Sequence, residues 1–371
     1  MRWCRNCLLP DTRPNLAIGG DGICNACAAH AGRRAIDWTS RATLFHRVVE
    51  HAKSQSGGYD CLIPVSGGKD STWQVATCLE AGLKPLAVTW KTPGRTAIGA
   101  ANLENLVRLG VDHIDYQVNP EVEKRFMTAA LTRFGDPGIP MHMALFSIPL
   151  AIAVRFRIPL VVWGENSAFE YGGTAEESRG FKLDAAWLRK YGVMHGTSWR
   201  NWVDESLSEK DMLPYAGPSD KELAAAGTNA VFLGYYYPWD PEATLAVATD
   251  NGFRRADRPK TGYYDYADID DDFISVHHWF KWYKFGFTRL FDNLSLEIRN
   301  GRIAREDALD IVRRRGDDTP HDDISSMCRF LGMDMDRFFA IAERFRNPSV
   351  WKRRGSTWMI PDFPIADWDW R

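Results

Sequence analysis

Six consecutive residues carry the clearest chemistry in this chain: Ser66, Gly67, Gly68, Lys69, Asp70 and Ser71. They follow a short apolar strand that starts at Cys61 and precede a helix predicted over about 72–80. Glycines permit a sharp turn, and the backbone N–H groups of such a turn and of the next helix converge on an anion. The lysine adds a mobile positive charge, and the serines add hydroxyl donors. We therefore expect a phosphate cradle; a glycine turn without a ligand is the competing interpretation.

The cradle is not a Walker A loop, because an aspartate follows the lysine where that motif has Ser or Thr. It resembles the SGG-x-DS loop of the PP-loop ATP pyrophosphatases. That resemblance implies cleavage of ATP between its α and β phosphates, with pyrophosphate held in the loop. Lys69 and Asp70 would then be catalytic as well as ATP-binding. Asp70 either caps the helix or binds Mg²⁺, an ion that ATP chemistry requires in any case.

Two C-x-x-C pairs near the start of the chain have the spacing of a metal site. The pairs are separated by sixteen residues, and they consist of Cys4, Cys7, Cys24 and Cys27. Four thiolates at this spacing close a tetrahedron around one Zn²⁺. So small a module has little core, so a metal would supply much of its folding free energy. We predict a structural zinc site; a redox pair is the alternative.

The pattern of apolar runs predicts an α/β fold. Strands are expected at residues 61–65, 85–90, 113–118, 160–165 and 230–236, alternating with helices that include a broken one at 141–156. This alternation indicates a doubly wound, five-stranded parallel sheet of the HUP/PP-loop type. We predict a zinc knuckle at 1–35, an ATP pyrophosphatase domain at 36–240 and a helical region at 241–371. Ligands bind beyond the carboxyl ends of such strands, so the cradle, Trp90 and Gly164 should share one crevice, in which Trp90 and Gly164 would bind ATP.

Polar residues follow the fourth strand directly. Glu165 and Asn166 lead to Glu170 and Tyr171, and then to a long loop that contains Glu176 and Glu177. Long loops at sheet edges usually carry function. Glu165 or Glu170 could hold Mg²⁺ or act as a general base on an incoming amine, with Asn166 and Tyr171 contacting the substrate. A solvated connector is the alternative.

The segment 273–289 is unusually aromatic and basic. Lys281, Lys284 and Arg289 could contact phosphates of a substrate while the aromatic side chains pack. Packing alone is an equally good interpretation, and His277 and His278 gain little weight without a visible partner. The fifteen tryptophans of the chain are attributed mainly to core packing.

Composition restricts the class of protein. The chain has 371 residues and a net charge of −2, which argues against a general nucleic-acid binder. The most apolar segment, residues 144–154, is short and contains Pro149, and no signal peptide is evident. A soluble cytoplasmic protein with reduced thiols is expected.

A second resemblance covers about residues 1–350. The two C-x-x-C pairs, the cradle, the motif at 164–173 and the motifs at 282–289 and 297–301 are together similar to the N-acetyl sugar amidotransferase family. That family contains the amidotransferases of bacterial O-antigen and nonulosonic-acid biosynthesis. It implies that the acetamido oxygen of a sugar attacks the α-phosphate of ATP, and that ammonia then displaces AMP to leave an acetamidino group.

The resemblance also implies a separate glutaminase as the source of ammonia, since no cysteine here has the context of a glutaminase nucleophile. A PP-loop tRNA-modifying enzyme of the thiolation or lysidine type is the first alternative. A nucleotide-binding sensor or zinc-ribbon adaptor without catalysis is the second.

Overall fold

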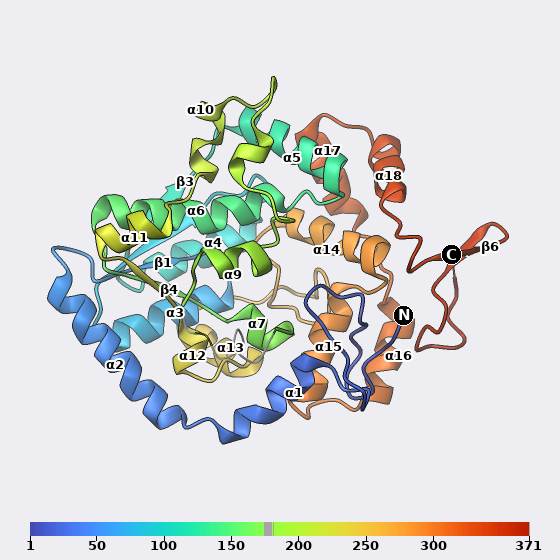
Figure 1. Ribbon diagram of the computed structural model, residues 1–371, viewed down its shortest axis with the longest axis horizontal. Helices are drawn as coiled ribbons and strands as arrows, with labels where there is room; N and C mark the ends of the chain where they lie inside the picture. The colour runs from blue at the N-terminus through green and yellow to red at the C-terminus, as the bar shows by residue number, and fades with distance from the viewer. Residues whose placement is uncertain (174–179, 181, 371) are drawn as a thin grey trace.

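The fold is built on one five-stranded parallel sheet. It is seen in a computed structural model that describes residues 1–173, 180 and 182–370 (Figure 1). All strand pairs of this sheet are parallel, in the order β3-β2-β1-β4-β5. The strands are β1 (Cys61–Pro64), β2 (Pro85–Trp90), β3 (Asp112–Tyr116), β4 (Leu160–Trp163) and β5 (Asn229–Phe232). The predicted doubly wound α/β fold is confirmed.

Helices cover both faces of this sheet, and successive strand residues face opposite layers. Leu62 of β1 packs into one hydrophobic cluster, while Cys61 and Ile63 pack into the other. The first layer contains α5 (Pro120–Phe134), α6 (Ile139–Phe156), α9 (Ala185–Tyr191), α10 (Glu209–Met212) and α11 (Asp220–Ala226). The second contains α2 (Trp38–Gln55), α3 (Lys69–Glu80), α4 (Ala97–Val107), α12 (Leu233–Tyr236) and α13 (Pro241–Asp250). Figure 1 shows α6 and α3 on opposite sides of the strands. Apolar residues on both faces are typical of a buried parallel sheet.

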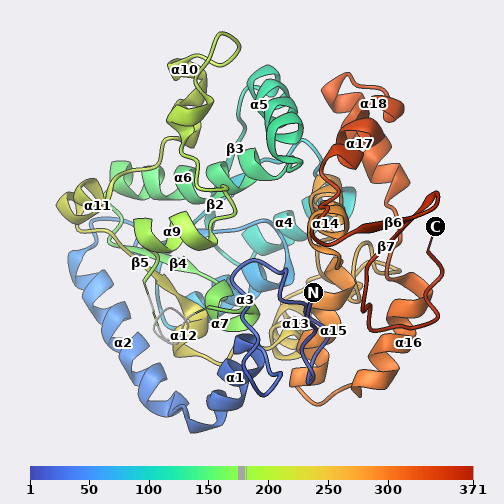
Figure 2. The same ribbon diagram turned by 45° about the vertical axis from the view of Figure 1, so that its right-hand side comes forward.

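The C-terminal region is helical, as predicted, and ends in a small hairpin. Figure 2 shows its helices beside the sheet layers. They are α14 (Asp272–Phe285), α15 (Arg289–Arg299), α16 (Arg305–Arg315), α17 (His321–Leu331) and α18 (Met335–Arg344), followed by β6 (Lys352–Arg354) and β7 (Thr357–Met359). Trp351 and Trp368 of the tail are buried against Trp282, so the tail belongs to the core of this region.

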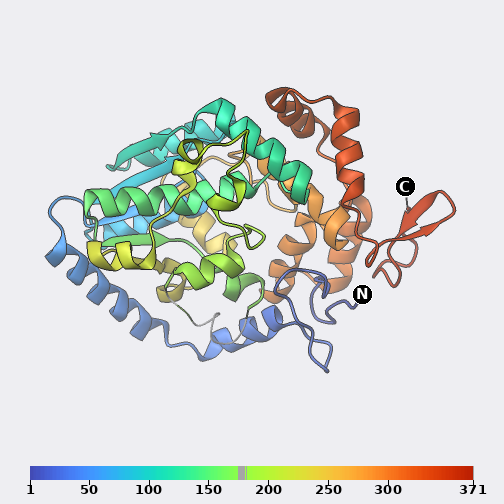
Figure 3. The same cartoon turned by 45° about the horizontal axis from the view of Figure 1, so that its top comes forward.

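The N-terminal segment packs on the C-terminal region although the two are far apart in sequence. Leu8 and Leu9 share one hydrophobic cluster with Phe291 and Leu294 of α15. The short helix α1 (Asn25–Ala31) contacts α7 (Ser167–Tyr171), which follows strand β4. Figure 3 shows the N-terminal segment between α7 and the C-terminal helices. Helix α1 leads through a 3₁₀ turn at Gly32–Ala35 into α2. The domain boundaries at 35 and 240 stay a prediction.

Three elements differ from the sequence-based expectation. Helix α3 begins at Lys69, so the second half of the cradle is its first turn. Residues 233–236 form α12 instead of extending β5, because the backbone turns and the Gly234 N–H donates to the Gly164 carbonyl, 3.0 Å away. Helix α6 is continuous across Pro149, whose missing N–H is tolerated inside a helix packed on the sheet.

Helix α6 is also long and apolar enough to cross a membrane by length and composition, and among the described residues no other helix is. Half of its apolar window is buried inside the protein, because it packs against β1, β2 and β4. Its apolar character is therefore explained by its place in the core.

Candidate functional site

The cradle is pre-formed at the carboxyl end of β1. Gly67 has φ +91°, and a Cβ at this position would lie 2.8 Å from the Gly99 carbonyl oxygen of α4. Only glycine accommodates both this backbone and this close approach. The Ser71 hydroxyl accepts a 3.0 Å hydrogen bond from the Ser66 N–H, which closes the turn. The first N–H groups of α3 therefore open toward a common point, the arrangement that binds phosphate at a helix N-terminus.

Lys69 is held in a cage, which corrects the expectation of a mobile charge. Its side chain is 4% exposed, and its ammonium lies 2.6 Å from an Asp70 carboxylate oxygen and 3.0 Å from the Thr244 hydroxyl. The ammonium also lies 5.2 Å from the ring centre of Trp239, whose indole N–H donates to Asp70. The lysine thus contributes a fixed positive charge to the first turn of α3. Thr244 and Trp239 were not predicted, because neither belongs to a recognisable motif.

Four predicted residues lie near one another beside the cradle, because the charges of Asp70 and Arg289 act on Glu165, and the charge of Arg289 acts on Tyr171 and Lys281 as well. Burial raises the pKa values of Glu165 and Tyr171, lowers that of Lys281, and opposes the raised pKa of Arg289. Each of these side chains is nevertheless only half-buried. The structure therefore brings these four together, as the position of the motifs at the carboxyl edge of the sheet predicts.

Glu165 and Asp70 form a carboxylate pair beside the cradle. After burial, the charge of Asp70 is the next cause that raises the pKa of Glu165, while Lys69 and Arg289 act in the opposite direction. Two carboxylates from the ends of β1 and β4 are oxygen ligands of the kind that Mg²⁺ prefers, and a divalent cation would relieve their repulsion. These residues fit a Mg²⁺–ATP site.

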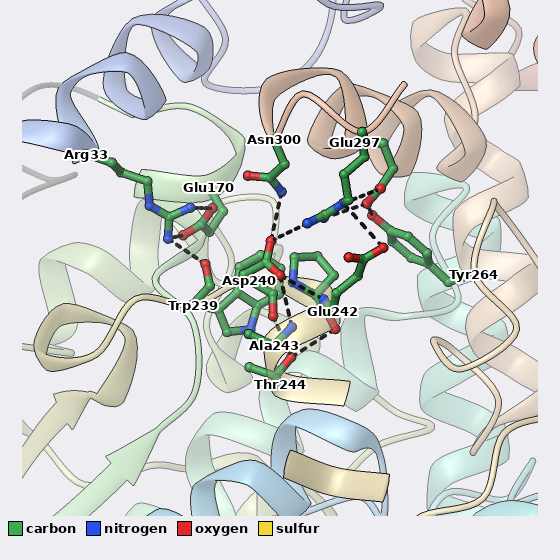
Figure 4. A network of polar contacts seen from close by, with 12 residues as sticks. Arg33, Glu170, Trp239, Asp240, Glu242, Ala243, Thr244, Tyr264, Glu297 and Asn300 are labelled. Atoms are coloured by element: carbon green, nitrogen blue, oxygen red, sulfur yellow. Dashed lines mark hydrogen bonds and ion pairs between the residues drawn. The ribbon is translucent and has the colours of Figure 1, made fainter. Parts of the chain in front are cut away.

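Glu170 is buried and bound on several sides. Arg33 places one guanidinium nitrogen 2.9 Å and the other 3.4 Å from the Glu170 carboxylate, and also donates to the Trp239 carbonyl (Figure 4). Arg299 donates to the Glu170 carbonyl at 2.9 Å. Burial raises the pKa of Glu170 to about 7, and Arg33 is the largest opposing influence. Glu170 therefore titrates near neutrality, as a general base can.

The N-terminal segment holds the same loop in place. Arg13 donates to the Tyr171 carbonyl at 3.1 Å, and its guanidinium lies 5.2 Å from the centre of the Tyr171 ring. Asn25 of α1 donates to the Gly173 carbonyl at 3.1 Å. We call Arg13, Asn25 and Arg33 the N-terminal clamp. Sequence reasoning missed all three, because their partners lie more than a hundred residues away.

The motif at 297–301 organises the start of α13. Arg302 pairs with Glu297 and with Asp240, and Asn300 donates to Asp240 at 3.0 Å (Figure 4). Glu297 also accepts from the Tyr264 hydroxyl. Asp240 caps the first turn of α13, the helix that carries Thr244 to Lys69. Through α13 and Thr244, this motif therefore helps to fix the position of Lys69 in the cradle.

The three predicted substrate-binding cations are all paired with acidic or carbonyl groups. Lys281 lies 2.9 Å from Asp292, which also binds Arg13. Arg289 lies 2.8 Å from Asp268. Lys284 donates to the Phe134 carbonyl and lies 3.8 Å from Asp136. Their predicted role in binding the phosphates of a substrate stays a prediction.

Three other predicted residues make structural contacts. The Trp90 indole donates to Glu123 of α5 at 3.4 Å. Asn166 is buried, donates to the Gly180 carbonyl and accepts from the Trp187 indole. A Cβ on Gly164 would lie 3.2 Å from Gln74, so this position is closely packed. Their roles toward ligands stay predictions, and Glu176 and Glu177 lie outside the described residues.

A polar cavity of about 980 Å³ lies on the other side of Arg289. Thr96, which caps α4, and Ile98 of α4 line it, close to Gly99, which packs on the cradle. Within the described part of the chain, two atoms of its lining are buried without a hydrogen-bond partner: His278 Nδ1 and Thr288 Oγ1. The cavity has room for a sugar-sized ligand close to the cradle.

The four predicted cysteine ligands converge, all of them buried. Their sulfur atoms lie within 4.8 Å of one another, with Cys4–Cys27 at 3.9 Å and Cys7–Cys24 at 3.8 Å. A tetrahedron with metal–sulfur bonds of about 2.3 Å has sulfur–sulfur edges of about 3.8 Å. The Asn6 amide and two backbone N–H groups point at these sulfurs, as expected for thiolates. The donor set fits zinc with no open position.

The fold and the cradle define the class: a doubly wound PP-loop-type α/β protein with a helical C-terminal region. Residues 260–362 match the model of the "LPS biosynthesis protein WbpG-like, C-terminal domain" family. Residues 260–362 are thus similar to that family, in agreement with the resemblance to the N-acetyl sugar amidotransferases.

Comparison with other proteins adds little to this assignment. The solved structure of NMN synthetase from Francisella tularensis is similar over 60% of this chain and 99% of that chain, at 12% identity and a TM-score of 0.29. A likeness this loose carries no argument about the site. No curated protein matches.

Proposed function

We propose that this protein is an ATP-dependent amidotransferase of lipopolysaccharide biosynthesis. It converts the acetamido group of an N-acetyl sugar, nucleotide-linked or a nonulosonate, into an acetamidino group and releases AMP and pyrophosphate. The observation that carries the proposal is the pre-formed cradle, with Glu165, Tyr171, Lys281 and Arg289 beside it. The WbpG-like match of residues 260–362 supports the sugar as acceptor.

The first step is adenylylation. The acetamido oxygen attacks the α-phosphorus of ATP, the bond to the bridging oxygen of the β-phosphate breaks, and an O-adenylyl imidate and pyrophosphate form. The cradle N–H groups, the Ser71 hydroxyl and the fixed charge of Lys69 stabilise the charge that develops on pyrophosphate. Asp70 and Glu165 would hold Mg²⁺, which supplies further charge neutralisation when bound.

The second step is amination. Ammonia attacks the imidate carbon, AMP leaves, and the acetamidino group remains. Glu170, whose pKa is about 7, is a candidate base, although its carboxylate is occupied by Arg33. A separate glutaminase supplies the ammonia, and the dependence on ATP and on soluble sugars places the reaction in the cytoplasm.

The test is a product assay. The protein is incubated with ATP, Mg²⁺ and ammonium chloride, and with free and nucleotide-linked N-acetyl sugars or with tRNA in parallel. AMP and pyrophosphate are quantified, and the acceptor is examined by mass spectrometry for replacement of an oxygen by an NH group. Product with a sugar supports the proposal. Product with tRNA alone, or ATP binding without pyrophosphate release across the panel, overturns it. Glutamine in place of ammonium should give no product.

A further inference from the structure

A buried aspartate binds two histidines just before the start of α6. Asp136 is 3% exposed, and its two carboxylate oxygens each lie 2.7 Å from an imidazole nitrogen, Nδ1 of His277 and Nε2 of His195. The Gly138 N–H also donates to Asp136, and the Lys284 ammonium lies 3.8 Å away. A carboxylate with this many donors stays ionised: its pKa lies well below the usual value, although burial acts in the opposite direction.

The contact with Asp136 orients His277. A carboxylate accepts hydrogen bonds, so the ring places its proton on Nδ1 and leaves a lone pair on Nε2. Within the described part of the chain, no residue occupies this Nε2, and the His277 side chain keeps 10% of its surface exposed. A Cβ on Gly138 would come within 2.6 Å of Nδ1, so the histidine reaches the aspartate only because residue 138 is glycine.

The pair lies at the same end of the strands as the cradle. Helix α6 leads directly into β4 and runs opposite to it, so the first turn of α6, next to Asp136, lies at the edge where the strands end. On α14, His277, Lys281 and Lys284 recur at i, i+4 and i+7 and so share one face. The charge of Lys281 acts on His142, beside His277, and the charge of Arg289 acts on both Lys281 and Glu165. Glu165, Arg289, Lys281 and His142 are thus neighbours in turn, and the ring centres of His142 and His277 lie 5.1 Å apart.

We propose that His277 accepts the proton that ammonia loses in the amination step. This inference rests on the proposed function. The ammonia nitrogen bonds to the imidate carbon and becomes a positively charged tetrahedral centre. Nε2 of His277 takes one proton from it, the C–O bond to AMP breaks, and AMP leaves with the electron pair. Asp136 stabilises the imidazolium that forms.

The neighbouring histidines are less suited to this role. His142 donates through Nδ1 to the Gly138 carbonyl, and burial lowers its pKa to about 4, so it is a weak base. His195 uses Nε2 for Asp136 and is 27% exposed on a surface loop. His278 points into the cavity, and burial holds its pKa well below the usual value. Together with Lys281 and Lys284, these histidines determine the electrostatic potential at His277.

The experiment compares His277→Gln with His195→Gln, which removes the other histidine of the same aspartate. Wild-type protein should form one acetamidino product for each pyrophosphate. For His277→Gln we expect the amination rate to fall by about 10²–10⁴-fold. The ratio of product to pyrophosphate should fall with it, because the imidate is hydrolysed instead. His195→Gln should keep the wild-type ratio.

A second measurement needs no substrate. Nitrogen NMR of labelled histidine should show the Nδ1–H tautomer for His277 in wild-type protein, and Asp136→Asn should abolish that preference. An unchanged ratio in His277→Gln overturns the proposal while leaving the amidotransferase function intact, and so does an Nε2–H tautomer in wild-type protein. If wild-type protein makes no acetamidino product at all, the proposed function fails first.

Discussion

Substitution of Arg33 by methionine tests the N-terminal clamp. The Arg33–Glu170 pair is nearly dry, with side-chain exposures of 12% and 4%, and one nitrogen–oxygen distance is 2.9 Å. Methionine keeps most of the volume and removes the charge. The buried carboxylate then loses the group that opposes its desolvation most strongly. Removing one partner of a buried pair typically costs about 3–5 kcal/mol.

The pH dependence makes this prediction specific. Glu170 has a folded pKa of about 7 against an ordinary value of 4.5, so the folded state favours the protonated carboxyl. Its contribution to stability is therefore complete below pH 4.5 and is lost as pH rises toward 7. A difference of about 2.5 pKa units at about 1.4 kcal/mol each is roughly 3 kcal/mol. Without Arg33 the pKa rises further, so the loss grows.

The assay is urea denaturation at pH 5 and pH 8, with Arg34→Met as the matched control, since Arg34 is its exposed neighbour. For Arg33→Met we expect a loss of about 3–5 kcal/mol at pH 8, where Glu170 is ionised, and about 1 kcal/mol at pH 5, where a protonated carboxyl needs no counter-charge. Adding Glu170→Gln should recover most of the loss at pH 8. Equal losses at both pH values, or losses matching those of Arg34→Met, would refute the reasoning.

Three further predictions concern the cradle and the metal. Gly67→Ala should cost about 1–3 kcal/mol from backbone strain and abolish ATP binding by calorimetry, whereas Gly58→Ala, which meets open space, should do neither. Thr244→Val removes a partner of the Lys69 ammonium and should weaken ATP binding without unfolding the protein; unchanged affinity would contradict the cage. Purified protein should contain one zinc per chain by elemental analysis, and Cys24→Ser or a strong chelator should lower the melting temperature; full stability without metal would contradict a structural site.

Local signals made much of the fold predictable. Helices α14 to α18 all lie in the region predicted to be helical, and caps such as Asp271 and Asp334 and the glycines after the helices mark their ends. The strand predicted at 230–236 runs four residues past the end of β5, because an apolar run does not show where a backbone must turn to meet Gly164. The β6–β7 hairpin carried no signal that we could read.

The site was less predictable than the fold because its charges are paired over long distances in sequence. The cradle, the four cysteines and Glu165 were found from type and spacing alone. Lys284 was proposed as a contact for substrate phosphates, and its partner Asp136 lies 148 residues earlier in the chain. His277 was given little weight for the same reason, since its orienting aspartate is visible only after folding. Spacing therefore identifies residues that act together in one segment and misses those that meet across the fold.

The proposed adenylylation mechanism depends most on which bond of ATP this protein breaks. The decisive measurement is the identity of the products formed from ATP labelled in its α- and γ-phosphates, with Mg²⁺, ammonium and the acceptor panel present. We predict labelled AMP and labelled pyrophosphate in equal amounts, both absent with Ser71→Ala and Asp70→Asn combined. Formation of ADP and inorganic phosphate, or unchanged turnover in that double variant, would contradict the central claim.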